Sequence, residues 1–164
     1  MQDDKKKHQI TKTNAARMLD AAGISYQLVP YEVDESDLSA VTLARKLNQD
    51  IEQVFKTLVL RGDKTGVLVC VIPGGEELDL KKAAKASDNK NVAMVPMKEI
   101  LDLTGYIRGG CSPIGMKKRY PIYIDETVPL QAVIYISAGM RGLQIRIAPD
   151  DLIRCADAQI CDLI

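Results

Sequence analysis

The sequence predicts an α+β fold built on a mixed, barrel-like curved sheet of about seven strands, flanked by four or five helices. Strand-like runs and helical patterns follow one another without the regular βαβα alternation of a parallel-sheet protein. Two apolar runs, 54–61 and 67–72, flank a turn that contains Gly62 and Gly66, which indicates an antiparallel hairpin. The length of 164 residues fits one domain, predicted at 11–164, behind a charged and flexible tail at 1–10.

The helices are predicted from apolar residues at helical spacing that follow a capping residue. Thr11 or Thr13, Ser39 and Asp79 can serve as N-caps, and Gly105 can end a helix. In chain order these helices end near residues 22, 47, 87 and 104, and a last short helix begins near residue 148.

The strands are predicted from short runs rich in leucine and β-branched residues that are bounded by turns. In chain order these runs cover residues 26–33, 54–61, 67–72, 91–95, 121–125, 133–137 and 143–147. The run 54–61 is apolar on both of its faces, which is typical of a strand that is covered on both sides.

Lys56 lies in the middle of that apolar run. An unpaired ammonium is costly to bury, so a lysine at such a position often serves a site. The alternative is that Lys56 extends its four-carbon stem to the surface. The run by itself leaves both interpretations open.

Composition argues against several classes of function. The 22 basic and 22 acidic residues balance, so the net charge gives no support for nucleic-acid binding. Four cysteines form no CxxC pair and His8 is the only histidine, which disfavours a zinc site, a disulfide framework and histidine-dependent catalysis. No phosphate-binding loop motif occurs, so we expect neither a metal nor a cofactor. The sequence contains no signal peptide and no run of about 20 apolar residues, which predicts a cytoplasmic protein without membrane contact.

A glycine-rich loop, Gly109-Gly110-Cys111-Ser112-Pro113, is the first candidate site. Two glycines allow backbone N–H groups to approach a phosphate or a carbonyl oxygen closely. A plain turn is the alternative. Cys111 is a candidate nucleophile, but the sequence offers no base to activate it, so a residue that fills space in the turn is favoured.

A second turn rich in small residues follows the run 133–137 and contains Ser137, Gly139 and Arg141. Tyr31 lies at an irregular strand position, where it can either stack on a base or pack in the core. None of these features is specific alone.

Taken together, five segments resemble the YbaK/EbsC family, and in particular its Cys-tRNA(Pro) deacylase branch. They are Phe55-Lys56-Thr57-Leu58, residues 79–84, residues 105–113, residues 135–143 and residues 148–152, in the same order as in the family. The resemblance covers about 11–162. It implies the mixed, barrel-like fold, and it relates the chain to the editing domain of bacterial prolyl-tRNA synthetases.

The resemblance implies an enzyme that hydrolyses mischarged Cys-tRNA(Pro), with Cys-tRNA(Cys) left open as a second substrate and with the substrate thiol attacking its own ester carbonyl. Such chemistry needs no cofactor. The implied partners are the acceptor end of proline tRNA and prolyl-tRNA synthetase. Two alternatives remain: a deacylase for another amino acid, such as Ala-tRNA(Pro), which needs a positioned water, and a non-catalytic module that binds aminoacyl-tRNA or a synthetase.

The resemblance also implies roles for individual residues. Lys56 would hold the phosphate or ribose of the terminal adenosine, and Thr57 would donate a hydrogen bond nearby. Gly109 and Gly110 would offer backbone N–H groups to the developing oxyanion. The other positions implied at the substrate are Tyr31, Cys111, Ser112, Pro113, Ser137, Gly139 and Arg141. The basic cluster 117–119 could touch the acceptor stem or be a solvated face.

Overall fold

The computed structural model describes residues 12–164. The predicted tail at 1–10, with His8, and the candidate cap Thr11 lie outside the described residues. Within them, helices and strands combine in a mixed α+β architecture, as predicted.

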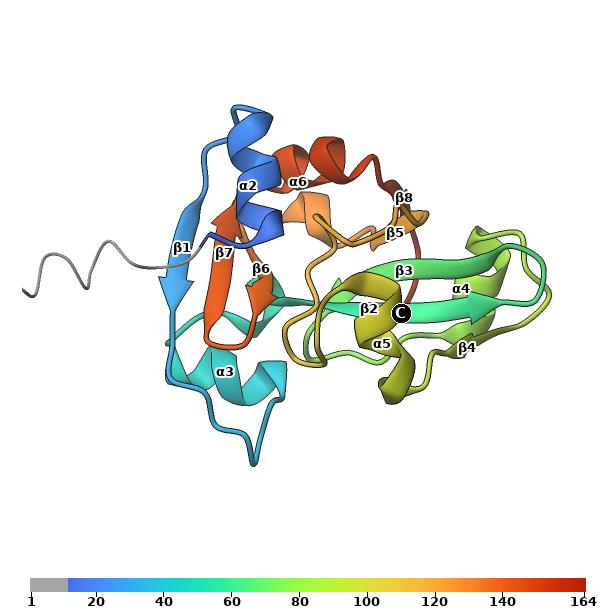
Figure 1. The fold of residues 1–164 in the computed structure, drawn as a ribbon, viewed down its shortest axis with the longest axis horizontal. Coiled ribbons are helices and arrows are strands. Elements are labelled where there is room, and N and C mark those ends of the chain that lie inside the picture. The colour runs from blue at the N-terminus through green and yellow to red at the C-terminus, as the bar shows by residue number, and fades with distance from the viewer. Residues whose placement is uncertain (1–11) are drawn as a thin grey trace, which may run out of the picture.

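The strands form two sheets (Figure 1). An antiparallel three-stranded sheet has the order β1-β7-β6, with β1 at Gln27–Pro30, β7 at Leu143–Ile147 and β6 at Ile134–Met140. A five-stranded sheet has the order β4-β2-β3-β5-β8. Its strands are β2 (Phe55–Gly62), β3 (Gly66–Pro73), β4 (Val92–Met94), β5 (Ile122–Asp125) and β8 (Gln159–Cys161). The pairs β3–β5 and β5–β8 are parallel and the others antiparallel, so this sheet is mixed.

The architecture differs from the prediction in two respects. The strands divide into two open sheets, which a single parallel bridge between Val54 and Tyr135 connects, instead of forming one barrel-like sheet. Strand β8 was also not predicted from the sequence, because three residues are too few to produce an alternating pattern.

The predicted hairpin is present as β2 and β3. Its register runs from Phe55 opposite Pro73 to Gly62 opposite Gly66. Gly66 has a φ of +77°, which glycine adopts at little cost, so the tight turn has a local cause in the sequence.

The five α-helices of residues 12–164 lie where the sequence predicted helices, three of them behind a predicted N-cap. They are α2 (Asn14–Ala21), α3 (Ala40–Lys46), α4 (Leu80–Ala86), α5 (Met97–Thr104) and α6 (Pro149–Ala156), and short 3₁₀ turns occur at η1 (Ile51–Gln53) and η2 (Val128–Leu130). The side chains of Thr13, Ser39 and Asp79 accept hydrogen bonds from the first turns of α2, α3 and α4. Among residues 12–164 no helix has the length and apolar character needed to cross a membrane.

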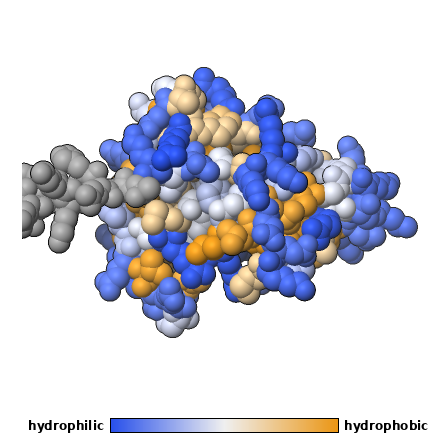
Figure 2. Space-filling model, in the orientation of Figure 1, coloured by the Kyte–Doolittle hydropathy of each residue, from blue (hydrophilic) through white to orange (hydrophobic). Residues whose placement is uncertain are grey.

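Two apolar clusters form the core. The larger one packs α2 and α6 against β6 and β7 and against one face of the five-stranded sheet, where Val71 and Ile124 contribute. The smaller one packs α4 against the opposite face through Leu68 and Ile72. The five-stranded sheet is therefore covered on both faces. Figure 2 shows apolar surface on the side of the molecule where α3 and α5 lie, and exposed residues of these segments include Val41 and Leu101.

Candidate functional site

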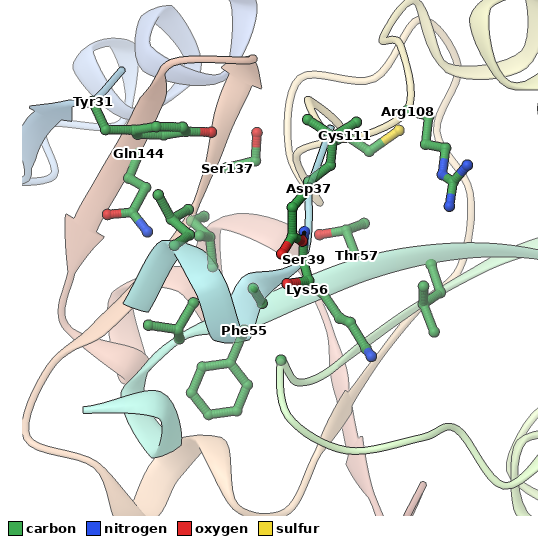
Figure 3. Close-up of a pocket in the computed structure, with 18 of the residues that line it drawn as sticks. Tyr31, Asp37, Ser39, Phe55, Lys56, Thr57, Arg108, Cys111, Ser137 and Gln144 are labelled. Carbon is green, nitrogen blue, oxygen red and sulfur yellow. Dashed lines mark hydrogen bonds between the residues drawn. The ribbon is translucent and has the colours of Figure 1, made fainter. Parts of the chain in front are cut away.

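A cavity of about 490 Å³ opens where the two sheets meet. Its walls come from the first half of β2, from β6 and β7, from the loop before α3 and from the glycine-rich loop after α5. The polar side chains that line it are Tyr31, Ser36, Asp37, Ser39, Lys56, Thr57, Arg108, Cys111, Ser137 and Gln144. In the view of Figure 3, Tyr31 and Gln144 lie at one end of the cavity and Arg108 at the other.

Lys56 and Thr57 line the cavity from β2, and in Figure 3 their side chains point in different directions. Lys56 is half-buried, so it is neither enclosed in the core nor extended onto an open face. Within residues 12–164 its ammonium takes part in no ion pair. A partly desolvated cation without a protein partner is suited to binding an anionic group of a ligand.

The glycine-rich loop contributes Gly109 and Cys111 to the wall. Gly109 has a φ of +81° and is exposed at the cavity. The N–H of Gly110 does not face a ligand, because it donates to the carbonyl oxygen of Ile107 at 2.9 Å. The resemblance implies that Gly110 donates a hydrogen bond to the oxyanion, but its N–H is already used within the loop. Of the two glycines, Gly109 is the one that lines the cavity.

Arg141 supports this loop from outside the cavity. Its Nε donates to the carbonyl oxygen of Arg108 at 2.9 Å. A Cβ added at Gly110 would lie 3.1 Å from the backbone nitrogen of Arg141, so the two backbones are in close contact. Instead of lining the opposite wall, as expected from the sequence, Arg141 fixes the position of the glycine-rich loop.

Three further predicted positions lie away from the cavity. Gly139, with a φ of +100°, packs against Tyr106, and an added Cβ would come within 2.7 Å of that ring. Ser112 is fully buried, and its Oγ has no hydrogen-bond partner among the described residues. Pro113 is also buried and lines a separate hollow of about 240 Å³. These residues shape the loops behind the wall and do not contact the cavity.

The Cys111 thiol lines the cavity but is not activated. Burial raises its pKa, and the hydroxyl of Thr104, 4.0 Å from the sulfur, only partly offsets that effect. A thiol with a raised pKa is protonated at neutral pH and is a weak nucleophile. This agrees with the expectation that Cys111 fills space in the turn.

Five polar residues of the cavity were not predicted as site residues from the sequence: Ser36, Asp37, Ser39, Arg108 and Gln144. Asp37 lies two residues before the predicted cap Ser39, so its position in the sequence indicated only the start of a helix. Gln144 is buried in β7, and its amide pairs with that of Gln49 at 2.9 Å. That pairing joins residues 95 positions apart, so no local pattern could reveal it.

The basic cluster 117–119 is exposed and does not line the cavity. Arg119 pairs with Asp157 at 3.3 Å, and both side chains are more than four-fifths exposed. Such a pair contributes little to stability. Among residues 12–164, no group of three or more His, Cys, Asp or Glu side chains could hold a metal ion.

Comparison with known proteins extends the sequence resemblance. The chain is 47% identical over 97% of its length, and 96% of the relative's, to EbsC of Enterococcus faecalis, a candidate Cys-tRNA(Pro)/Cys-tRNA(Cys) deacylase. It is 32% identical over 91 residues to a proline–tRNA ligase of Kosmotoga olearia, which is 55% of this chain and 15% of the ligase.

A solved structure described as a candidate trans-editing enzyme for prolyl-tRNA synthetase superposes with a TM-score of 0.79 at 26% identity. The superposition covers 92% of this chain and 97% of that structure. A model of the aminoacyl-tRNA editing domain matches residues 35–155, which contain most of the cavity wall. The chain belongs to the aminoacyl-tRNA editing domain family.

Proposed function

We propose that the chain is a trans-editing deacylase, acting in the cytoplasm, that hydrolyses the ester of cysteine mischarged on proline tRNA. The observation that carries this proposal is that the described residues of the cavity offer binding groups but no activated nucleophile or base. The raised pKa of Cys111 disfavours its thiolate, and hydrogen bonds from Thr42 and Ser39 lower the pKa of Asp37 to about 2, which makes it a poor base. A substrate that brings its own nucleophile fits such a site.

Cysteine is such a substrate. Its sulfur attacks the carbonyl carbon of its own ester, and the bond from that carbon to the ribose oxygen breaks. The ribose oxygen leaves with the proton that the thiol gives up, and the released thiolactone is then hydrolysed by water. The protein's contribution is to hold the thiol and the carbonyl in reacting geometry and to stabilise the charge that develops on the carbonyl oxygen.

The proposed roles follow from where each side chain lies. Lys56 binds the phosphate or ribose of the terminal adenosine, with Thr57 beside it on β2. Gly109 offers its N–H to the developing oxyanion. Tyr31 and Ser137 line the rest of the cavity and contact the sugar, the base or the aminoacyl group.

Single-turnover deacylation of Cys-tRNA(Pro), Ser-tRNA(Pro) and Ala-tRNA(Pro) tests the proposal. Serine is the sharpest control because it differs from cysteine only by oxygen in place of sulfur. We expect rapid loss of cysteine and slow loss of serine and alanine. Comparable loss of alanine or serine would show a protein-bound water as the nucleophile, and absence of turnover on all three would indicate a non-catalytic binding module.

We further propose that prolyl-tRNA synthetase supplies the selection of proline tRNA. A chain with balanced charge gains little affinity for tRNA from phosphate contacts. Cys-tRNA(Pro) and Cys-tRNA(Cys) should therefore be deacylated at similar rates by the protein alone and at different rates when the synthetase is present. Equal discrimination under both conditions would refute the role of the synthetase.

A further inference from the structure

Among the described residues that line the cavity, Asp37 is the only carboxylate. It lies in the loop before α3, where two hydrogen bonds fix its side chain. Oδ1 accepts from the N–H of Ser39 at 3.0 Å, and Oδ2 accepts from the hydroxyl of Thr42 at 2.5 Å. These bonds favour the charged form and lower the pKa from 3.8 to about 2, so the carboxylate is ionised at neutral pH.

The carboxylate retains capacity for a further donor. An ionised carboxylate has about four lone-pair sites, and the two protein hydrogen bonds use half of them. Within residues 12–164 no ion pair connects Asp37 to Lys56 or Arg108, the two cations of the cavity. The cavity thus presents one oriented negative charge and separate positive charges.

This distribution of charge matches the charged end of an aminoacyl-tRNA. The phosphate of the terminal nucleotide is negative, and the α-ammonium group beside the ester carbonyl is positive. With Lys56 assigned to the phosphate or ribose, the positive end of the substrate still requires an anionic partner. Of the cavity wall within residues 12–164, only the Asp37 side chain can provide one.

We propose that Asp37 receives the α-ammonium group of the aminoacyl ester, so that the site selects esters with a free amino group over N-acylated or peptidyl esters. This inference rests on the proposed deacylase function. Asp37 then contributes to specificity and positioning: by holding the α-ammonium group, it fixes the rotation of the aminoacyl group and hence the approach of its thiol to the carbonyl.

A two-by-two experiment tests this assignment. Wild type and Asp37→Asn are compared on cysteinyl-tRNA(Pro) and on 3-mercaptopropionyl-tRNA(Pro), which keeps the thiol and lacks only the α-amino group. Each rate is divided by the uncatalysed rate of the same ester. Loss of a hydrogen bond to a charged group predicts a fall in kcat/KM of about 10- to 100-fold for Asp37→Asn on the cysteinyl ester. On the analogue, the two proteins should be equal.

Asn keeps an acceptor for the N–H of Ser39, so the substitution is expected to preserve the loop. The matched control is Asp34→Asn, three residues away. Asp34 is held in the same manner by the N–H and hydroxyl of Ser36 but does not line the 490 Å³ cavity. Asp34→Asn should leave both rates unchanged.

Each outcome distinguishes the two proposals. Absence of wild-type turnover on the cysteinyl ester would refute the deacylase function itself. Wild-type turnover with Asp37→Asn equally active on both esters would refute only the role of Asp37. An equal fall on both esters would also overturn it, because that result is expected if Asp37 supports only the loop.

Discussion

Replacement of Lys56 by methionine should separate activity from stability. Methionine keeps the length of the side chain and removes the charge. Because Lys56 has no ion-pair partner within residues 12–164, removal of its charge breaks no ion pair in that part of the protein. We therefore expect the melting temperature of Lys56→Met to equal or exceed that of the wild type.

The expected loss of activity follows from the contact that the ammonium is proposed to make. A hydrogen bond between charged groups in a partly desolvated site contributes about 1.5 to 3 kcal/mol, which corresponds to about 10- to 150-fold in kcat/KM. The phosphate that Lys56 is proposed to hold keeps its charge throughout the reaction. Most of the loss should therefore appear in the half-saturating enzyme concentration and less in the rate at saturation.

Single-turnover deacylation of Cys-tRNA(Pro) over a range of enzyme concentrations measures both quantities. Lys64→Met is the matched control, because Lys64 is an exposed cation in the turn at the far end of the same hairpin. If Lys56→Met lost stability but deacylated as well as Lys64→Met, Lys56 would be a structural residue and the assignment of the cavity would be wrong.

Two further substitutions test the glycine-rich loop. Cys111→Ala should keep most of the deacylation rate, since the raised pKa of this thiol disfavours its thiolate. The small void that it leaves should lower the free energy of unfolding, measured in urea, by about 1 kcal/mol. Abolished turnover with an intact fold would make Cys111 a catalytic residue. Gly110→Ala should cost about 1 to 3 kcal/mol, because its Cβ would meet the backbone of Arg141 at 3.1 Å. It should also lower kcat/KM about 10- to 100-fold by shifting the loop. Gly66→Ala is strained at a φ of +77° and should also lose stability, but it meets no atom within 4 Å and lies at the far end of the hairpin, so its kcat/KM should be unchanged. Equal kinetics in the two variants would contradict the proposed role of the loop.

The elements of this fold were predictable where their cause is local. Ser39 and Asp79 cap their helices because a short oxygen-bearing side chain can reach the N–H groups of the following turn, and this depends on few neighbouring residues. The division into two sheets was not predictable in this way. It depends on the pairing of β1 with β7 and of β3 with β5, and the residues of each pair lie far apart in the sequence.

The candidate site shows the same limit. Lys56 was conspicuous because a charge within an apolar strand contradicts its surroundings, and the structure places it at the cavity. Gly139 and Arg141 were misplaced because a glycine-rich turn indicates close backbone contact without identifying the contacting group. For Gly139 that group is the ring of Tyr106, and Arg141 hydrogen-bonds the carbonyl of Arg108. Asp37 was missed because an aspartate just before a helix is readily explained as part of the helix cap.

The distribution of charge over the whole chain constrains how editing could be selective. The cavity contains one oriented carboxylate and two cations, whereas the sequence carries 22 basic and 22 acidic residues and no excess positive charge to hold a tRNA body. If the substrate thiol and Asp37 act as proposed, the site distinguishes aminoacyl groups by the thiol and the α-ammonium group at the end of the molecule. Correctly charged Cys-tRNA(Cys) presents the same end. Its protection must then come from contacts outside the cavity, which is the physical reason for expecting a partner that recognises the tRNA.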